Sequence, residues 1–286
     1  LITMHARIAA QTEKEMAYLD YIYEVVPSNG NYSWERHNLG MYFSKDLAPK
    51  VNYGLSLNMR RQQSWFYDSP KNYGMEEPDE LFRLETGGTL SWQMTDRWKL
   101  DVGYSIFTAS DFKEALDLSE IQHSGKVVLA TDIGTTTPNQ QLSFGFGYGI
   151  LRKHPLLYPI LSFSRSLSKN INVDIGFPRT TVHYSIDERH EIRTSGSFKG
   201  EYTNIHLPVG TPDDLPHGEM RLAQYAIDVN IGYTYKIQPQ WYTLIKVGYL
   251  INNTAVITDG QGNIAYDLST EPSVYLSMGL TFKIRD

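Results

Sequence analysis

The chain has 286 residues, of which 41% are hydrophobic, and a formal net charge of −6. The absence of cysteine excludes disulfides, cysteine–metal sites and an N-terminal lipidated cysteine. Acidic and basic residues are interspersed, which leaves no basic stripe for nucleic acid, and no run of about 18 apolar residues is present to form a transmembrane helix.

The first residues are the hardest to assign. Because the chain opens at Leu1 rather than Met, we expect a mature or truncated form. Alternation of apolar and polar residues begins here but breaks at 11–15. Residues 1–14 are therefore predicted to lengthen the first strand or to form an N-terminal arm, and residues 15–286 to form a single transmembrane β-barrel domain.

Several later segments alternate between apolar and polar or small residues with the period of a β-strand. They are 50–60, 82–94, 98–107, 141–151, 220–236 and 272–284. Charges and amides on the polar face would be costly to bury unpaired in a protein core. The pattern predicts an all-β fold, namely a closed antiparallel transmembrane β-barrel with lipid outside and a polar lumen inside. A large soluble antiparallel sheet or β-sandwich is the alternative.

The pattern predicts fourteen strands joined by connections that alternate between short and long. The assigned strands are 15–26, 32–44, 50–65, 80–94, 98–111, 121–131, 138–151, 157–167, 171–177, 180–186, 190–206, 220–236, 241–256 and 271–284. Pro178 cannot donate to a ladder, so twelve strands are the alternative if 171–186 is a bent excursion. An even number puts both termini on the short-turn side, which is periplasmic in bacterial outer-membrane barrels. The surfaces expected to meet partners or ligands are 66–79, 112–137, 207–219 and 257–270.

Aromatic residues mark the expected water–lipid boundaries. Tyrosine is unusually frequent, at 20 residues, and Tyr and Trp have the apolar body and polar tip that suit such a boundary. The girdle candidates near predicted strand ends are Tyr32, Trp34, Trp65, Tyr67, Trp98, Tyr158, Trp241 and Tyr242.

The predicted polar face carries charges of both signs. These lumen-lining candidates are Arg60, Arg83, Glu85, Asp101, Asp174, Arg193, Lys199, Asp228 and Lys246. Such a set forms either a salt-bridged network that fills a closed lumen or the lining of a selective pore. The spacing does not choose between the two.

No motif predicts catalysis, a metal site or a cofactor. His183 and Ser185 lie two residues apart on one strand face, the spacing seen in outer-membrane phospholipases and lipid A deacylases. We interpret them as ordinary lumen residues, because those enzymes act at the lipid-facing surface. Asp213 and Asp214 are a weak calcium candidate, since a loop with two acidic residues is common.

Three stretches carry a resemblance to a known family: 176–178 (Gly-Phe-Pro), 182–187 (Val-His-Tyr-Ser-Ile-Asp) and 280–284 (Leu-Thr-Phe-Lys-Ile). With them, residues 32–286 resemble an uncharacterised outer-membrane β-barrel family of Bacteroidota. The resemblance implies an outer-membrane location and offers no catalytic residues. Outer-membrane barrels often end on an aromatic residue, whereas Phe282 is followed here by four more residues.

The sequence therefore predicts a non-enzymatic, multi-pass outer-membrane barrel in contact with lipid and lipopolysaccharide. Its expected role is structural or accessory, in a complex with other outer-membrane proteins, as several barrels of this phylum act. The alternatives are a passive or selective channel for small solutes and an outer-membrane lipid hydrolase.

Overall fold

The computed structural model describes residues 15–27, 32–66, 80–113, 117, 120–133, 140–151, 154–206, 220–259, 262–268 and 270–285. The predictions for residues 1–14, and for calcium at Asp213 and Asp214, lie outside these residues. No helix in the described ranges is long and apolar enough to cross a membrane.

The described residues form long β-strands. The first seven are β1 (Glu15–Val26), β2 (Tyr32–Ala48), β3 (Val51–Phe66), β4 (Glu80–Gln93), β5 (Trp98–Ser110), β6 (Ile121–Asp132) and β7 (Gln140–Ile150). The others are β8 (Pro155–Ser166), β9 (Ile171–Phe177), β10 (Arg179–Ser185), β11 (His190–Ile205), β12 (Met220–Lys236), β13 (Trp241–Asp259), β14 (Ile264–Asp267) and β15 (Ser273–Arg285).

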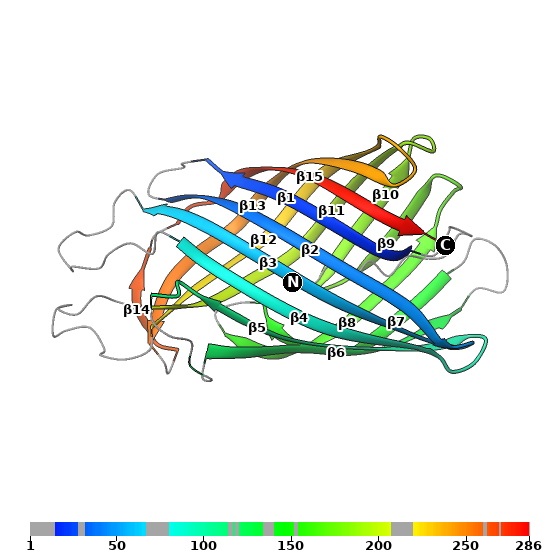
Figure 1. Cartoon of the computed structure of the whole chain (residues 1–286), viewed down its shortest axis with the longest axis horizontal. Helices are drawn as coiled ribbons and strands as arrows, with labels where there is room; N and C mark the ends of the chain where they lie inside the picture. The colour runs from blue at the N-terminus through cyan, green and yellow to red at the C-terminus, as the bar shows by residue number, and fades with distance from the viewer. Residues whose placement is uncertain are drawn as a thin grey trace.

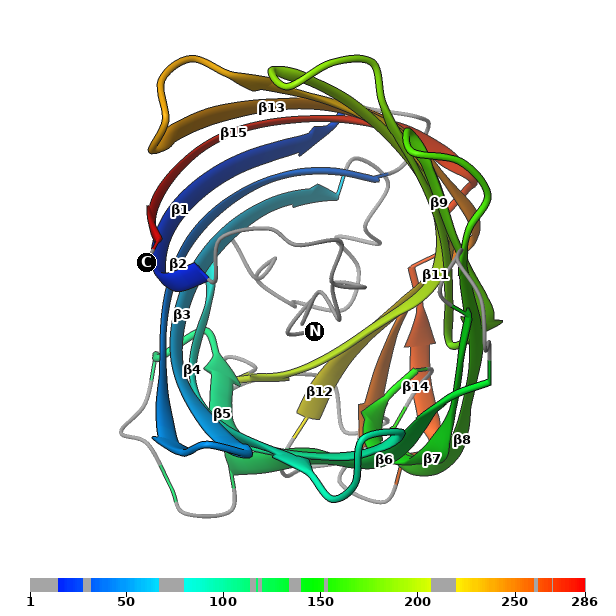
Figure 2. The same cartoon turned by 90° about the vertical axis from the view of Figure 1, so that its right-hand side faces the viewer.

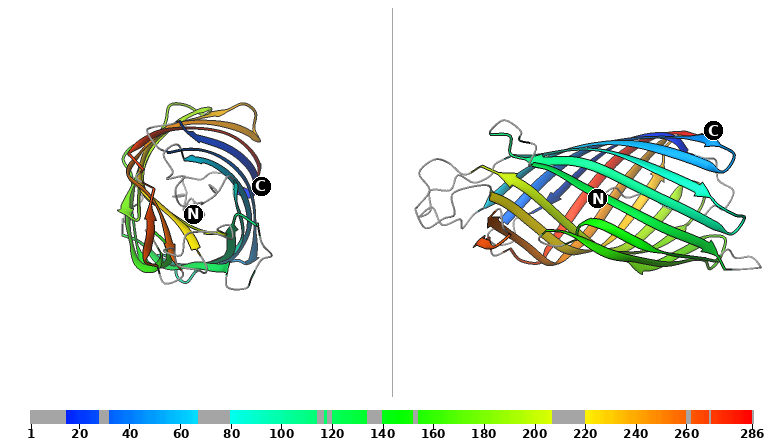
Figure 3. Two further views of the ribbon diagram at one scale, coloured as in Figure 1. Left: turned by 90° about the vertical axis from the view of Figure 1, so that its left-hand side faces the viewer. Right: turned by 90° about the horizontal axis from the view of Figure 1, so that it is seen from below.

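The strands close into one antiparallel barrel (Figures 1 and 3). Consecutive strands pair from β1 to β13, and β15 joins β13 to β1, so fourteen strands form the ring. The predicted closed fourteen-stranded barrel is confirmed. The twelve-strand alternative is wrong, because β9 and β10 both pair in the wall and Pro178 lies only at their hairpin tip.

Two details of the predicted connections are wrong. The segment 257–270 contains β14, which pairs with β13 but is not one of the fourteen strands of the ring. The surface expected at 112–137 overlaps the predicted strand 121–131, which is β6 and part of the wall, so these bounds are too wide for a connection. The strand within 257–270 was missed because it lies in a stretch that turn-forming residues make look like a loop.

The outer surface of the barrel is an apolar belt. Alternate residues of every long strand face outward, and many are exposed, such as Phe146 at 62% and Leu161 at 56%. On β3 the outward apolar residues are flanked by Lys50, in the turn before the strand, and by Arg61. These two charged residues lie eleven residue steps apart, which at about 3.3 Å per residue and a tilt of about 40° is about 28 Å. A bilayer-spanning barrel carries an apolar band of about 25 Å, which fits between them, so the belt and the closed ring favour the transmembrane barrel over a soluble sheet.

Inward glycines make room for tyrosine rings. A Cβ on Gly248 would lie 2.2 Å from the ring of Tyr275, and one on Gly147 would lie 2.5 Å from the ring of Tyr158. Tyr275 is completely buried as a result. Side chains are therefore crowded on the curved inner face, and glycine opposite these rings avoids a steric clash.

Side-chain caps hold the short turns. Asp187 Oδ1 accepts hydrogen bonds from the backbone N–H groups of Arg189 at 2.7 Å and His190 at 2.9 Å. The bond from Arg189 lowers the pKa of the Asp187 carboxyl below its usual value. Ser168 Oγ accepts in the same way from the N–H groups of Asn170 and Ile171. These caps fix the register of the hairpins.

Candidate functional site: the closed lumen

The C-terminal ends of β11 and β13 and the N-terminal end of β12 leave the wall and enter the barrel. Figure 2 shows β11 and β12 crossing the interior toward β5. Together with β14 they form a four-stranded layer, which we call the inserted sheet: residues 198–205, 220–226, 254–259 and 264–267. The inserted sheet lies at the end of the barrel that carries the long connections (Figure 1).

Two features of the strands produce this inward bend. The β9–β10 hairpin has only seven residues per strand, so β10 pairs with β11 no further than Ser197. On β13, Asn252 and Asn253 both oppose Ala226, which makes a β-bulge. Asn252 has a φ of 48°, a left-handed conformation that asparagine tolerates. Bulges bend a strand, and this one lies where β13 turns inward.

The edge of β11 that β10 leaves free is paired elsewhere. Asn204 pairs with Ser110 of β5 in parallel register, and the Asp111 N–H donates to the Asn204 carbonyl at 3.3 Å. Gln122 Nε2 of β6 donates to the Tyr202 carbonyl at 2.9 Å. His206, directly after β11, donates its N–H to Asp111 Oδ2 at 2.9 Å. These bonds attach the inserted sheet to the opposite wall.

Both faces of the inserted sheet are packed. Tyr202, Ala223 and Val256 lie in one buried cluster with wall residues Phe107, Ala109 and Ile150. Leu222, Ile257 and their neighbours lie in a second cluster with Leu81 of β4, and Ala265, Tyr266 and Leu268 pack against it. Leu222 and Ala223 are completely inaccessible to solvent. The barrel mouth at the long-connection end is therefore filled by an apolar core.

Below this core, Glu201 of β11 spans the lumen. Its carboxylate accepts from Arg36 Nη2 at 2.9 Å and pairs with Arg60 Nη1, so β11 is bound to β2 and β3 on the opposite wall. Arg60 Nε also donates to Asn38 at 2.8 Å. Arg83, on β4, donates to Glu85 at 2.8 Å. Each of these three guanidinium groups therefore has a carboxylate partner, and Arg36 and Arg60 share Glu201.

A second carboxylate, Glu24 of β1, connects Arg36 of β2 to lysines of β11 and β13. It lies 3.3 Å from Lys246 Nζ, 3.7 Å from Lys199 Nζ and 3.6 Å from Arg36. Lys199 also lies 3.3 Å from Asp228, which accepts a hydrogen bond from the Tyr275 hydroxyl at 2.8 Å. Glu24, Arg36 and Glu201 thus link charges from opposite sides of the barrel into one lumen network.

The nine predicted lumen charges fall into two groups. Six belong to or border the lumen network: Arg60, Arg83, Glu85, Lys199, Asp228 and Lys246. The other three lie toward the short turns in local pairs: Asp101 with Lys99 and Ser91, Asp174 with Ser164, and Arg193 with Glu191. Their lining of a functional lumen stays a prediction.

Sequence reasoning missed the three residues that link the two sides, Glu24, Arg36 and Glu201. Strand parity was an available signal, because Glu201 shares its face with Lys199, and Arg36 shares its face with Asn38. Parity gives the face, but only the inserted sheet brings Glu201 to β2 and β3. Pairing across a lumen leaves no trace in spacing along the chain.

Three girdle predictions are wrong. Trp34 is 5% exposed and packs inside with Val26 and Tyr275, beneath Arg36. Tyr158 faces inward against Gly147, and Tyr242 lies on the same inward face as Lys246, with Lys283 over its ring. Proximity to a strand end does not decide which way a side chain points, because parity does.

The other girdle candidates are placed outward or not described. Trp65 and Trp241 are exposed on the outer face, and Trp98 packs against the outward Phe144. The side chain of Tyr32, and Tyr67 as a whole, lie outside what the structure describes.

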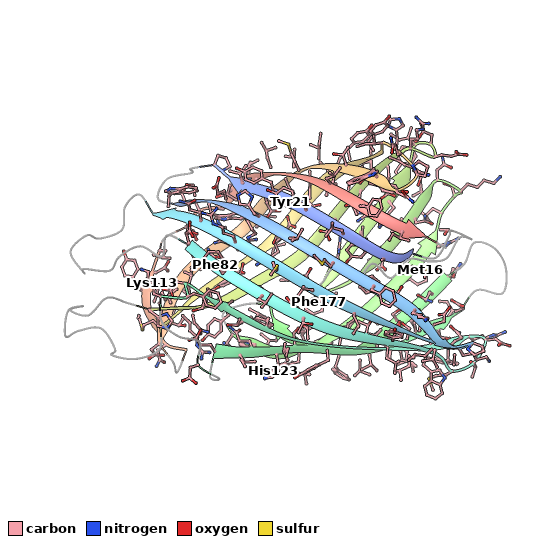
Figure 4. All side chains as sticks on the ribbon, viewed as in Figure 1. Met16, Tyr21, Phe82, Lys113, His123 and Phe177 are labelled. Atoms are coloured by element: carbon pink, nitrogen blue, oxygen red, sulfur yellow. The ribbon has the colours of Figure 1, made fainter. Side chains whose placement is uncertain are left out.

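The sequence prediction missed outward tyrosine–histidine pairs near the edges of the apolar belt. Tyr21 Oη lies 2.7 Å from His37 Nδ1, Tyr104 Oη lies 2.7 Å from His123 Nδ1, and Tyr233 Oη lies 2.5 Å from His190 Nδ1. Tyr21 and His123 are labelled in Figure 4.

The His183 and Ser185 pair is not arranged for catalysis. His183 Nδ1 lies 3.3 Å from both Glu191 Oε1 and Arg193 Nε, and no hydrogen bond joins it to Ser185 among the described residues. A serine nucleophile needs a base within hydrogen-bond reach. Nor, within the described ranges, do three His, Asp or Glu side chains gather closely enough to hold a metal ion.

Comparison with known proteins identifies one family model, described as "Domain of unknown function (DUF6268)", which matches residues 71–283. No curated protein sequence matches the chain. Among solved structures, it is similar to an outer-membrane channel from Pseudomonas putida F1, at 8% identity and a TM-score of 0.49, covering 96% of this chain and 99% of the other.

Two further solved structures show the same kind of likeness. A Pseudomonas aeruginosa FadL homologue matches at 11% identity and a TM-score of 0.47, covering 93% of this chain and 89% of the other. LpxR from Salmonella typhimurium matches at 8% identity and a TM-score of 0.41, covering 93% and 100%. Likenesses at this level concern barrel architecture only.

Proposed function

This chain belongs to the family described as "Domain of unknown function (DUF6268)", and we propose that it is a non-enzymatic outer-membrane β-barrel with a structural or accessory role in an outer-membrane complex. The short turns then face the periplasm and the long connections face outward. Lipid and lipopolysaccharide surround the apolar belt, and the source is a bacterium of the Bacteroidota.

The observation that carries this proposal is the closed lumen. The inserted sheet fills one mouth with buried apolar side chains, and Glu201 is bound to Arg36 and Arg60 across the interior. A diffusion pore needs a continuous wet path, which a packed apolar core blocks. The hydrogen-bonding partners of His183, which are Glu191 and Arg193 rather than Ser185 among the described residues, support the non-enzymatic part of the proposal.

Purification tests the accessory role. The tagged chain, expressed at its native level and extracted in mild detergent, is expected to co-purify with other outer-membrane proteins at a fixed stoichiometry. Planar-bilayer recording of the purified barrel is expected to show no steady conductance. A barrel that purifies alone and conducts ions steadily would contradict both parts.

A second candidate function is a channel that opens when the inserted sheet moves. The short-turn half of the lumen favours it, because this half is lined by charges of both signs, such as Asp174 and Arg193. The β11 edge of the inserted sheet is attached to the opposite wall by one strand pair with β5 and by ion pairs with β2 and β3 rather than by a continuous ladder.

One variant pair separates the two functions. Glu201→Ala combined with Arg36→Ala removes the ion pairs of Glu201 with Arg36 and Arg60, and a gated channel is then expected to conduct in planar bilayers while the parent is silent. Glu191→Ala with Arg193→Ala removes a lumen ion pair near the short turns and is the matched control. Silence of both variants would remove the channel candidate.

A further inference from the structure

A hollow lies in the lumen directly below the lumen network, against the inner face of β1 to β4. It has a volume of about 150 Å³ and is lined by Tyr18, Asp20, Asn38, Ser56, Asn58 and Arg60, among others. The strand register explains its shape. Asp20, Gly40 and Asn58 form one cross-strand row, and Asn38 with Arg60 forms the row above, toward the lumen network.

Gly40 makes room for two polar side chains that line the hollow. A Cβ at this position would lie 2.3 Å from Asp20 Oδ1 and 3.1 Å from Asn58 Oδ1. The missing side chain therefore lets the Asp20 and Asn58 side chains project over the Gly40 backbone. Gly40 is itself buried beneath them.

The polar groups around the hollow have unused hydrogen-bonding capacity. Asp20 and Asn58 make no side-chain hydrogen bond and no ion pair with any residue that the structure describes. Toward the described part of the chain, Asn38 uses only its side-chain oxygen, which accepts from Arg60. The lumen network just above is different, because Arg83, Glu85 and Glu201 all have ionic partners there. Unpaired capacity is thus concentrated at one place.

We propose that this hollow binds a small organic cation that carries hydroxyl groups. An ionised carboxylate that is half withdrawn from water is stabilised by a positively charged donor, and no described cation lies within ion-pair distance of Asp20. Lys283 of β15 acts on Asp20 only from farther away. The amides of Asn38 and Asn58 and the Ser56 hydroxyl can pair with hydroxyl groups. Arg60 is paired with Glu201 and Arg83 with Glu85, which leaves Asp20 as the charged group of the hollow lining that has no ion pair with any described residue.

The volume limits the size of the ligand. A cavity of about 150 Å³ accommodates a molecule of roughly six to eight non-hydrogen atoms. Larger oligosaccharides and peptides are excluded. Binding here does not require the barrel to conduct, because the hollow lies on the short-turn side of the closure.

A pair of isosteres tests the proposal on the purified, detergent-solubilised barrel. Diethanolamine is protonated at neutral pH, and diethylene glycol has the same size and both hydroxyl groups but an uncharged ether oxygen in place of the ammonium. Titration calorimetry is expected to show that diethanolamine binds roughly tenfold or more tightly than diethylene glycol, as for a charge-assisted hydrogen bond. Equal affinity for the two probes, or binding of neither, would overturn the proposal.

Variants locate the site. Asp20→Asn is expected to abolish the preference for the cation, whereas Asp101→Asn, a lumen carboxylate already paired with Lys99, is expected to preserve it. Gly40→Ala is expected to weaken both probes, because its Cβ displaces the Asp20 carboxylate. Circular dichroism verifies that each variant is folded. An Asp20→Asn barrel that is folded and keeps the full preference would refute the assignment.

Discussion

Replacing Glu201 with alanine tests whether the lumen network stabilises the barrel. Glu201 and Arg36 each retain 12% exposure, and Arg60 retains 20%, so the substitution leaves two largely buried guanidinium groups without a shared partner. Losing one member of a buried ion pair costs about 3–5 kcal/mol. Arg36 keeps Glu24 at 3.6 Å and Arg60 keeps Asn38 at 2.8 Å, which reduces the expected cost to about 2–3 kcal/mol.

Urea unfolding of the barrel in lipid vesicles, followed by tryptophan fluorescence, measures this loss as a lower midpoint at unchanged slope. Glu201→Gln keeps the acceptor oxygen and is expected to cost less, about 1–2 kcal/mol. Glu191→Gln is the control, because its pair with Arg193 is one-third exposed and is expected to contribute less than about 1 kcal/mol. A loss below about 0.5 kcal/mol for Glu201→Ala would show that the cross-lumen bonds do not stabilise the fold.

Three further substitutions probe the wall and the bend. Gly248→Ala places a Cβ 2.2 Å from the Tyr275 ring, and we expect an overpacking cost of about 1–3 kcal/mol in the same urea assay. Gly196 has open space around it, so Gly196→Ala should change stability by less than about 0.5 kcal/mol. Equal effects at the two sites would contradict this packing account. Asn252→Val forces a β-branched residue into a left-handed conformation and is expected to lower the free energy of unfolding by about 1–2 kcal/mol, whereas Asn252→Gly should be tolerated. A valine variant as stable as the parent would show that the bend does not depend on this conformation. Leu276→Arg in the apolar belt should cost about 2–4 kcal/mol in vesicle-folding equilibria, against about 0–1 kcal/mol for Leu47→Arg near the short turns, and similar costs would argue against a lipid-facing belt at Leu276.

The alternation of residues was sufficient to predict the wall. Segments such as 141–151 and 220–236 alternate because one face meets lipid and the other meets the lumen, and each forms a strand close to its predicted bounds. The even strand number followed from placing both termini on the short-turn side. The predictions for Trp34 and Tyr158 were wrong because position near a strand end was used in place of parity as the guide to direction.

The closure of the lumen could not be predicted in this way. Alternation continues through Tyr202, so Lys199 and Glu201 look like any lumen-facing residues of a straight strand. The closure depends on two features of the tertiary structure. The short β9–β10 hairpin leaves the end of β11 without a wall partner, and the bulge at Asn252 turns β13 inward.

A strand's two faces are set by a period of two residues, which the sequence by itself records. Contacts across the lumen join β11 to β2, β3 and β5, which are more than ninety residues away along the chain. The tertiary structure alone decided them, because they depend on where a whole sheet edge ends and not on any local pattern.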